Sequence, residues 1–235
     1  MNTRQEAILE AIVREYVDTA EPVGSMVLVE KYHFSYSPAT IRAEMALLED
    51  EKYIYQPHIS AGRIPTEKGY RYFVDMLSSE REALLKREER IIKRRLQGQN
   101  SRHERIADTA AMTLADMTGN VGMVGYSDAI YLHGFTNLFR QPEFLGDNSK
   151  ALGAVEIFDR LRELMIELPY TLNPVVYIGS ESPVGKSSGC SLVVSGFEAP
   201  DGSRGRLVVM GPIRMFYPKT IAVIEEVKYL LESVI

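Results

Sequence analysis

Apolar residues recur at helical spacing through the N-terminal part of the chain. They do so over 3–18, 25–32 and 37–48, and the segment 19–24, with its proline and glycine, interrupts the pattern. A short apolar run at 53–55 then precedes a stretch rich in turn residues. This order predicts three helices followed by a two-stranded hairpin.

The third of these segments has an uneven distribution of side chains. Ser37 can accept a hydrogen bond as the N-cap, and Pro38 suits the first helical position, where its missing N–H costs nothing. An apolar stripe follows at Ile41, Met45 and Leu48. The other side carries the small residues Ala39, Thr40, Ala43 and Ala46. A solvated face would normally carry Lys and Glu, so small residues indicate close approach to another surface.

The stretch that follows predicts a tight hairpin. Gly62 and Arg63 are expected at its tip, and Thr66 is expected to cap the next helix after Pro65. A helix with a small-residue face beside a hairpin tipped by arginine is typical of a winged helix-turn-helix that enters DNA grooves. The alternative is an ordinary helical bundle that contains an amphipathic helix.

Periodicity predicts one long helix from Thr66 to about Leu96. Apolar residues have heptad-like spacing within it, at 77, 84 and 91 and again at 85 and 92. Two alternatives remain for this helix, which are contact with a second subunit and packing against its own second domain. We expect a domain over 1–78, a connecting helix and linker over 79–103, and a second domain over 104–235.

The second domain is expected to combine helices with short strands. The helices are predicted over 104–117, over 150–168 and from Tyr217 towards the C-terminus. The strands are predicted over 121–126, 129–135, 175–180, 191–198 and 206–211. This order predicts an α+β fold in which helices flank an antiparallel sheet.

Net charge argues against strong DNA binding. The formal charge of the 235 residues is −5, and residues 1–78 hold 8 Lys and Arg against 12 Asp and Glu. Because phosphate neutralisation supplies most non-specific affinity, this excess of acid predicts modest affinity per subunit and a need for a dimer. The basic residues in or beside the proposed contact elements are Arg42, His58, Arg63, Lys68 and Arg71.

Composition favours a cytoplasmic protein without a membrane partner. No signal-peptide pattern is visible, and no apolar run approaches the ~18 residues of a membrane span. Cys190 is the single cysteine, so an intrachain disulfide is excluded.

Catalytic and cofactor signals are weak. The sequence 183–187 is similar to the end of a phosphate-binding P-loop, but five residues separate Gly179 from Gly185, where that loop has four. A polar hairpin loop is favoured instead. The four histidines have no metal-ligand spacing, and no Gly-x-Ser-x-Gly elbow occurs. We therefore expect no enzyme activity, no cofactor and no metal.

Several motifs resemble those of the HrcA family, which are bacterial heat-inducible transcription repressors. They are Glu21-Pro22-Val23-Gly24-Ser25, Ser37-Pro38-Ala39-Thr40-Ile41-Arg42, the stretch 56–71, and later segments within 137–144 and 211–218. The resemblance implies a homodimer that binds an inverted-repeat operator upstream of chaperone genes. It also implies a GAF-like second domain and a chaperonin that keeps the repressor active.

Three features depart from the family pattern. Ala43 and Glu44 stand where members usually have Asn and Asp, and Ile59 stands where they usually have Thr. The chain is also too short for the full dimerisation segment that the family usually carries within its second domain.

The expected DNA contacts follow from the winged-helix interpretation. Those expected near phosphates or base edges in a major groove are Tyr36, Ser37 and Thr40. Those expected against thymine methyl groups are Ala39 and Ala43. Arg42 is the best candidate for guanine or phosphate. Arg63 is expected in a minor groove, with His58 and Ser60 on the backbone and Lys68 and Arg71 nearby.

The alternative function is that of a regulator whose second domain senses a small molecule. A ligand pocket should be concave, with a few inward polar groups. The predicted strands carry mainly Val, Leu, Ile and Met, which favours a filled core.

Overall fold

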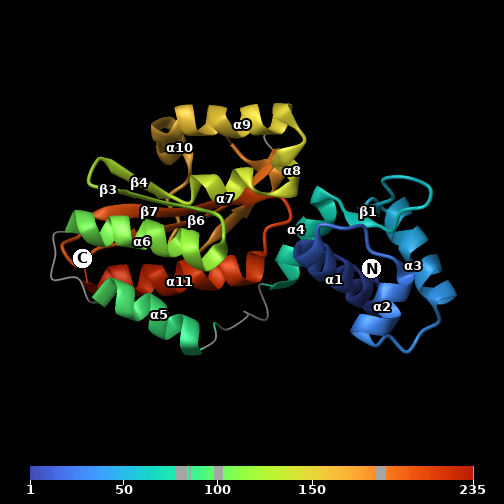
Figure 1. The fold of residues 1–235 in the computed structure, drawn as a ribbon. Helices are drawn as coiled ribbons and strands as arrows, with labels where there is room; N and C mark the ends of the chain where they lie inside the picture. Colours follow the sequence, from blue (N-terminus) through green and yellow to red (C-terminus); the bar gives the residue numbers. More distant parts are fainter. Residues whose placement is uncertain (78–83, 85, 98–102, 184–188, 235) are drawn as a thin grey trace. The chain divides into compact units, whose positions relative to one another are not determined.

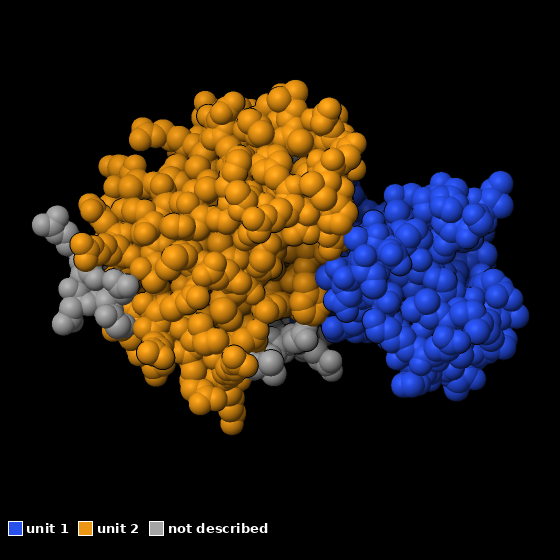
Figure 2. Space-filling model, viewed as in Figure 1, with its two compact units in different colours: residues 1–80 blue, residues 81–235 orange. Residues whose placement is uncertain are grey.

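The computed structural model describes residues 1–77, 84, 86–97, 103–183 and 189–234. The chain forms two compact units, residues 1–80 and residues 81–235, which are coloured separately in Figure 2. Within the described ranges, no helix is both long and apolar enough to cross a lipid bilayer.

The first unit contains the elements that the sequence predicts, in the predicted order (Figure 1). They are α1 (Thr3–Thr19), α2 (Ser25–Tyr32), α3 (Pro38–Asp50), β1 (Ile54–Tyr55), β2 (Ile64–Pro65) and α4 (Glu67–Leu77). α1 packs against each of the other three helices. Buried apolar side chains, among them Ile8, Ile12, Leu28 and Ile41, form the core between them. Burial of such side chains is the main favourable contribution to the stability of this unit.

The predicted helix caps are confirmed. The Ser37 hydroxyl accepts a hydrogen bond from the backbone N–H of Thr40 at 3.1 Å, and the Thr66 hydroxyl accepts one from the N–H of Gly69 at 3.1 Å. Each cap satisfies a donor that the first turn of a helix leaves unpaired.

The predicted position of the hairpin tip is wrong. Arg63 and Val23 exchange two backbone hydrogen bonds of 2.9 Å, so this end of the loop is held against the chain that precedes α2. A side chain at Gly62 would overlap the Val23 carbonyl group. The exposed tip is instead formed around Ile59, which is 98% exposed. Glycine serves here for close packing against a distant segment, which local sequence does not reveal.

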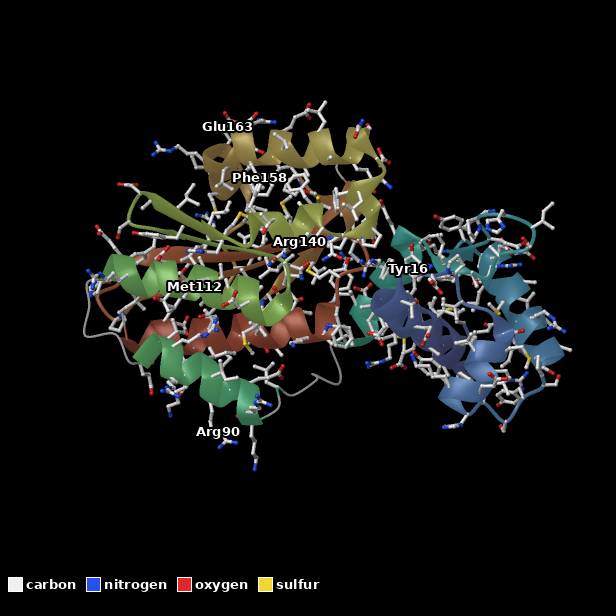
Figure 3. All side chains as sticks on the ribbon, viewed as in Figure 1. Tyr16, Arg90, Met112, Arg140, Phe158 and Glu163 are labelled. Carbon is white, nitrogen blue, oxygen red and sulfur yellow. The ribbon has the colours of Figure 1, made fainter. Side chains whose placement is uncertain are left out.

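The single long helix predicted from Thr66 to about Leu96 is also wrong. α4 ends at Leu77, α5 spans Lys86–Gln97, and Leu84 between them is not helical. Residues 78–83 and 85, and the predicted linker at 98–101, lie outside the described residues. α5 packs on its own unit through Ile92 and Leu96, which are fully buried, whereas Arg90 points away from that unit (Figure 3).

The second unit is built on one antiparallel sheet of five strands in the order β4-β3-β7-β6-β5. The strands are β3 (Val121–Tyr126), β4 (Ala129–His133), β5 (Val175–Tyr177), β6 (Cys190–Glu198) and β7 (Arg204–Pro212). One face is covered by α6 (His103–Thr118) and α11 (Tyr217–Val234), with α5 packed on these two helices (Figure 1). The other face is covered by α7 (Phe135–Phe139), α8 (Pro142–Leu145), α9 (Asn148–Asp159) and α10 (Leu161–Glu167). The predicted α+β class is confirmed.

Three local predictions for this unit need correction. The helix expected over 150–168 is interrupted at Arg160 and forms α9 and α10. α7 and α8 were not predicted, and Phe135 of α7 packs edge-on against Phe158 of α9 at 4.5 Å between ring centroids. β5 stops before Gly179, whose φ of +49° begins a short 3₁₀ turn, Gly179–Glu181. The P-loop-like residues 184–187 lie outside the described part of the chain.

α6 approaches the sheet most closely at Gly122 of β3. A Cβ there would lie 2.6 Å from the backbone nitrogen of Ala115 and would overlap the Ala111 carbonyl. Ala107, Ala110, Ala111 and Ala115 make the facing side of α6 small and fully buried. The helix and the sheet therefore meet through backbone and methyl groups.

We expect Gly122→Ala to lower the free energy of unfolding by about 2 kcal/mol, because overpacked cores lose roughly that amount. Gly125→Ala in the same strand is the matched control, since a Cβ there would meet Met165 at an ordinary 3.5 Å. It should change stability by less than about 0.5 kcal/mol. Urea unfolding followed by far-ultraviolet circular dichroism measures both, and equal losses would contradict the close approach of α6.

Candidate nucleic-acid interface

One side of α3 is buried and the other is open to solvent. Ile41, Met45 and Leu48 are at most 4% exposed and face the core of the first unit. The exposed side carries Ala39, Arg42, Ala43, Ala46 and the half-exposed Leu47. We call this set the small-residue face. Its three alanines leave part of the helix surface without long side chains, and that part can approach another molecule at short distance.

The N-terminal end of α3 holds hydroxyl groups in fixed positions. The Ser37 and Thr40 hydroxyls lie 3.0 Å apart. Tyr36 immediately precedes them, is 37% exposed, and lies beneath the Arg4 guanidinium at 4.4 Å from the ring centroid. The first turn of a helix has free backbone N–H groups and a positive dipole end, so this region suits a phosphate group.

Glu44 fixes α3 on α1. Its carboxylate accepts hydrogen bonds from Arg4 Nη1 at 2.9 Å and from Gln5 Nε2 at 3.1 Å. The Glu44 side chain is 12% exposed. Its negative charge is therefore paired on the α1 side of the helix. The glutamate that replaces the usual residue of the family pattern at this position has a structural role.

Arg42 lies on the small-residue face with a weak intramolecular contact. Its Nη1 is 3.4 Å from the Ser25 hydroxyl at the start of α2, which is long for a hydrogen bond. The guanidinium keeps further donors in a planar fork that fits a phosphate or a guanine edge.

Glu49 joins α3 to the hairpin. One carboxylate oxygen accepts the backbone N–H of Gln56 at 2.9 Å, and the other accepts Arg63 Nε at 2.8 Å. The Arg63 side chain is only 19% exposed. Arg63 is therefore committed to Glu49 in this structure and does not extend from the hairpin tip.

Gln56 supports the loop from within. Its side-chain amide donates to the backbone carbonyl oxygens of Ile59 at 2.9 Å and of Ala61 at 2.8 Å. These bonds satisfy loop carbonyls and fix the path of residues 56–61. The exposed tip then carries Ile59 together with His58 and Ser60, whose Nδ1 and Oγ atoms lie 3.2 Å apart.

Lys68 and Arg71 lie on α4 and have partners of their own. The Lys68 ammonium donates to the Glu51 backbone oxygen at 2.7 Å and lies 4.1 Å from the Tyr53 ring centroid. Arg71 pairs with Asp75 at 3.4 Å. Lys68 thus contacts the turn that follows α3.

Sequence reasoning identified the small-residue face but missed the residues that position it. Glu49 stands in the acidic run 49–51, and nothing local distinguishes it from Asp50 or Glu51. Gln56 and Glu44 were likewise missed as positioning residues. The roles of Glu49 and Glu44 depend on Arg63 and Arg4, which only the folded chain brings near, and that of Gln56 depends on the path of the loop.

We expect Glu49→Ala to free the hairpin, because it leaves Arg63 and the Gln56 N–H without their acceptor. Amide hydrogen exchange in peptides that cover 54–64 should become about tenfold faster, as expected for loss of a charge-assisted pair. Glu51→Ala removes the same charge from an exposed side chain and should leave exchange unchanged. Equal exchange in the two variants would show that Glu49 does not hold the hairpin.

Comparisons with a family model and with named proteins point to the same family. The model of the HrcA protein C-terminal domain family matches residues 71–221. The heat-inducible transcription repressor HrcA of Acidothermus cellulolyticus is 48% identical over 126 residues, which cover 54% of this chain and 37% of that protein. This match therefore spans little more than a third of the relative.

Two further comparisons cover the whole chain. The heat-inducible transcription repressor HrcA of Carboxydothermus hydrogenoformans is 29% identical over 338 aligned positions, which cover 100% of this chain and 98% of that protein. Since this chain has 235 residues, the relative has positions without a counterpart here. A crystal structure of a hypothetical protein at 2.2 Å resolution has a TM-score of 0.78 at 20% identity, covering 100% of this chain and 98% of that chain. It shows that the fold has been observed before.

Proposed function

The chain belongs to the HrcA family of heat-inducible transcription repressors, and on this premise we propose that it represses transcription by binding DNA. The target is an inverted-repeat operator upstream of chaperone genes, bound by a dimer. The observation that supports this proposal best is the small-residue face of α3, exposed beside a hairpin that Glu49 holds in place. Repression requires no catalysis, since a bound repressor acts by occupying its operator.

Residues 1–78 then act as a winged helix-turn-helix. α2 and α3 are the helix pair, α3 is the recognition helix, and the loop between β1 and β2 is the wing. The order of three helices and a hairpin supports this interpretation. Residues 79–103 connect it to a GAF-like domain over 104–235, supported by the antiparallel sheet with helices on both faces.

α3 reads the major groove in this proposal. Tyr36, Ser37 and Thr40 approach phosphates or base edges at the start of the helix. Ala39 and Ala43 contact thymine methyl groups, for which short apolar side chains are suited. Arg42 gives up its long contact with Ser25 and binds guanine or phosphate.

The wing contacts DNA through its tip rather than through Arg63. His58 and Ser60 approach the backbone, and Ile59 lies against the sugar edges of a minor groove, where apolar side chains of DNA-binding proteins are often found. Arg63 positions the wing through Glu49. Lys68 and Arg71 of α4, which follows the wing in the chain, add positive charge.

Four acidic side chains of the first unit are engaged in internal contacts. Glu44 and Glu49 are paired as described above, Glu15 accepts Lys31 at 2.6 Å, and Glu6 accepts the Tyr72 hydroxyl at 2.6 Å. Carboxylates held in this way cannot turn towards an approaching phosphate backbone. The formal excess of acid therefore permits modest affinity, which two subunits on one inverted repeat would raise.

The remaining partners follow from the family. We propose that the protein acts in the cytoplasm and that a chaperonin keeps the repressor active. Dimerisation must use surfaces of this shorter chain, since the alignment of 338 positions leaves relatives with additional residues.

Gel shifts with duplex DNA from upstream of the gene for this chain test the contacts. Arg42→Ala should weaken binding about tenfold, as expected for loss of one arginine contact. The salt slope is the slope of the logarithm of the binding constant against the logarithm of the salt concentration. A fall of about one in its magnitude would assign Arg42 to a phosphate, and an unchanged slope would assign Arg42 to a base. Arg63→Ala should weaken binding by about threefold to tenfold with an unchanged salt slope, because it removes the support of the wing.

The matched control is Arg105→Ala, which removes an exposed arginine from α6 in the second unit. It should bind DNA as the unaltered protein does. Binding that survives both Arg42→Ala and Arg63→Ala would overturn the proposed interface.

A further inference from the structure

The second unit contains a hollow of about 260 Å³ at one end of its sheet. It lies between the β3–β4 turn, the start of β7 and α10. Its charged lining residues are Arg162, Arg204, Arg206 and Asp128, so three guanidinium groups face one carboxylate. The apolar part of its lining is formed by Ile130, Met165 and Ile166.

Arg206 occupies an unusual position for a cation. β7 is the central strand, and Arg206 is paired with Gly125 of β3 on one side and with Gly196 of β6 on the other. Strand alternation places it on the same face as Val208 and Met210, which belong to the core beneath α9 and α10. Gly125 leaves room beside the charged side chain, whereas the Tyr170 ring fills the space above Gly196.

The Arg206 guanidinium is incompletely satisfied. Its Nε atom is buried and has no hydrogen-bond partner among the described residues. The Tyr170 ring lies over the sheet beside Arg206, with its centroid 5.6 Å from the guanidinium carbon. The same ring covers Gly196. A ring face attracts a cation but does not accept the in-plane N–H groups. Because desolvating a donor without an acceptor is unfavourable, Arg206 is held in the sheet at a cost in stability.

The other two arginines that line the hollow are exposed. Arg204 is 65% exposed and has Glu198 at 3.7 Å as its carboxylate partner. Arg162 of α10 is exposed, and no ion pair is recorded for it within the described ranges. Both side chains therefore retain donors that can turn towards a bound group.

We propose that this pocket binds a small organic anion that carries a phosphate or carboxylate group. The oxyanion binds among the guanidinium groups of Arg162, Arg204 and Arg206, because a guanidinium fork matches such oxygens in geometry and charge. The apolar lining accommodates the remainder of the ligand. The volume is just below the about 300–1,000 Å³ of drug-sized sites, so it fits a small metabolite and excludes a DNA duplex.

This inference is independent of the proposed DNA contacts, since it concerns only residues of the second unit. Its test uses the full chain without DNA, at constant ionic strength. The probes are phenyl phosphate, which has an apolar ring, and inorganic phosphate, with binding measured by titration calorimetry. Phenyl phosphate should bind saturably and at least tenfold more tightly than inorganic phosphate.

Arg206→Met should weaken phenyl phosphate binding at least tenfold. It should also raise the melting temperature of the ligand-free protein, because it removes a buried unpaired donor. The melting curve shows in the same experiment that the variant is folded. Arg105→Gln, which removes an exposed arginine on α6, is the matched control and should bind phenyl phosphate normally.

Three results would overturn the proposal. The first is no saturable binding of phenyl phosphate, and the second is equal loss of binding in Arg105→Gln and Arg206→Met. The third is displacement of phenyl phosphate by non-specific duplex DNA, which would assign the arginines to a nucleic-acid surface. None of these measurements depends on whether the first unit binds an operator.

Discussion

The carboxylate of Glu49 fixes the geometry on which the candidate DNA interface depends. It binds the Gln56 N–H and the Arg63 guanidinium, which lie at the two ends of the hairpin loop. Arg63 is bonded in turn to the backbone of Val23, before α2. One acidic side chain thus links the end of α3, the wing and the segment that leads into the helix pair. The negative charge of Glu49 would repel DNA, but its hydrogen bonds position the surfaces that we propose to contact DNA.

Local signals predicted much of the fold. The caps at Ser37 and Thr66 and the apolar stripe from Ile41 to Leu48 follow from short-range chemistry, and the structure confirms them. The predictions of the hairpin tip and of one long helix were wrong, because both features depend on contacts between residues far apart in the sequence. Gly62 packs on Val23, and the apolar side of α5 packs against α6 and α11. The exposed face of α3 was predictable, whereas the positioning roles of Glu44, Glu49 and Gln56 needed their partners in space.

The two units have different kinds of candidate site. The first offers an exposed and nearly flat helix face with a protruding loop, which suits the surface of a duplex. The second has a partly open hollow lined by three arginines, which suits a small anion. Membership of the HrcA family supports the first role, and the three arginines that line the hollow support the second.

Oxidative footprinting of the full chain, with and without operator DNA, tests the central claim most directly. Tyr36 and Ile59 are 37% and 98% exposed in the proposed interface, whereas Leu152 and Tyr229 are 61% and 68% exposed in the second unit. Our account predicts that DNA lowers the oxidation rates of Tyr36 and Ile59 and leaves those of Leu152 and Tyr229 unchanged. Saturating DNA that protects Leu152 or Tyr229 while Tyr36 and Ile59 are oxidised as before would contradict it.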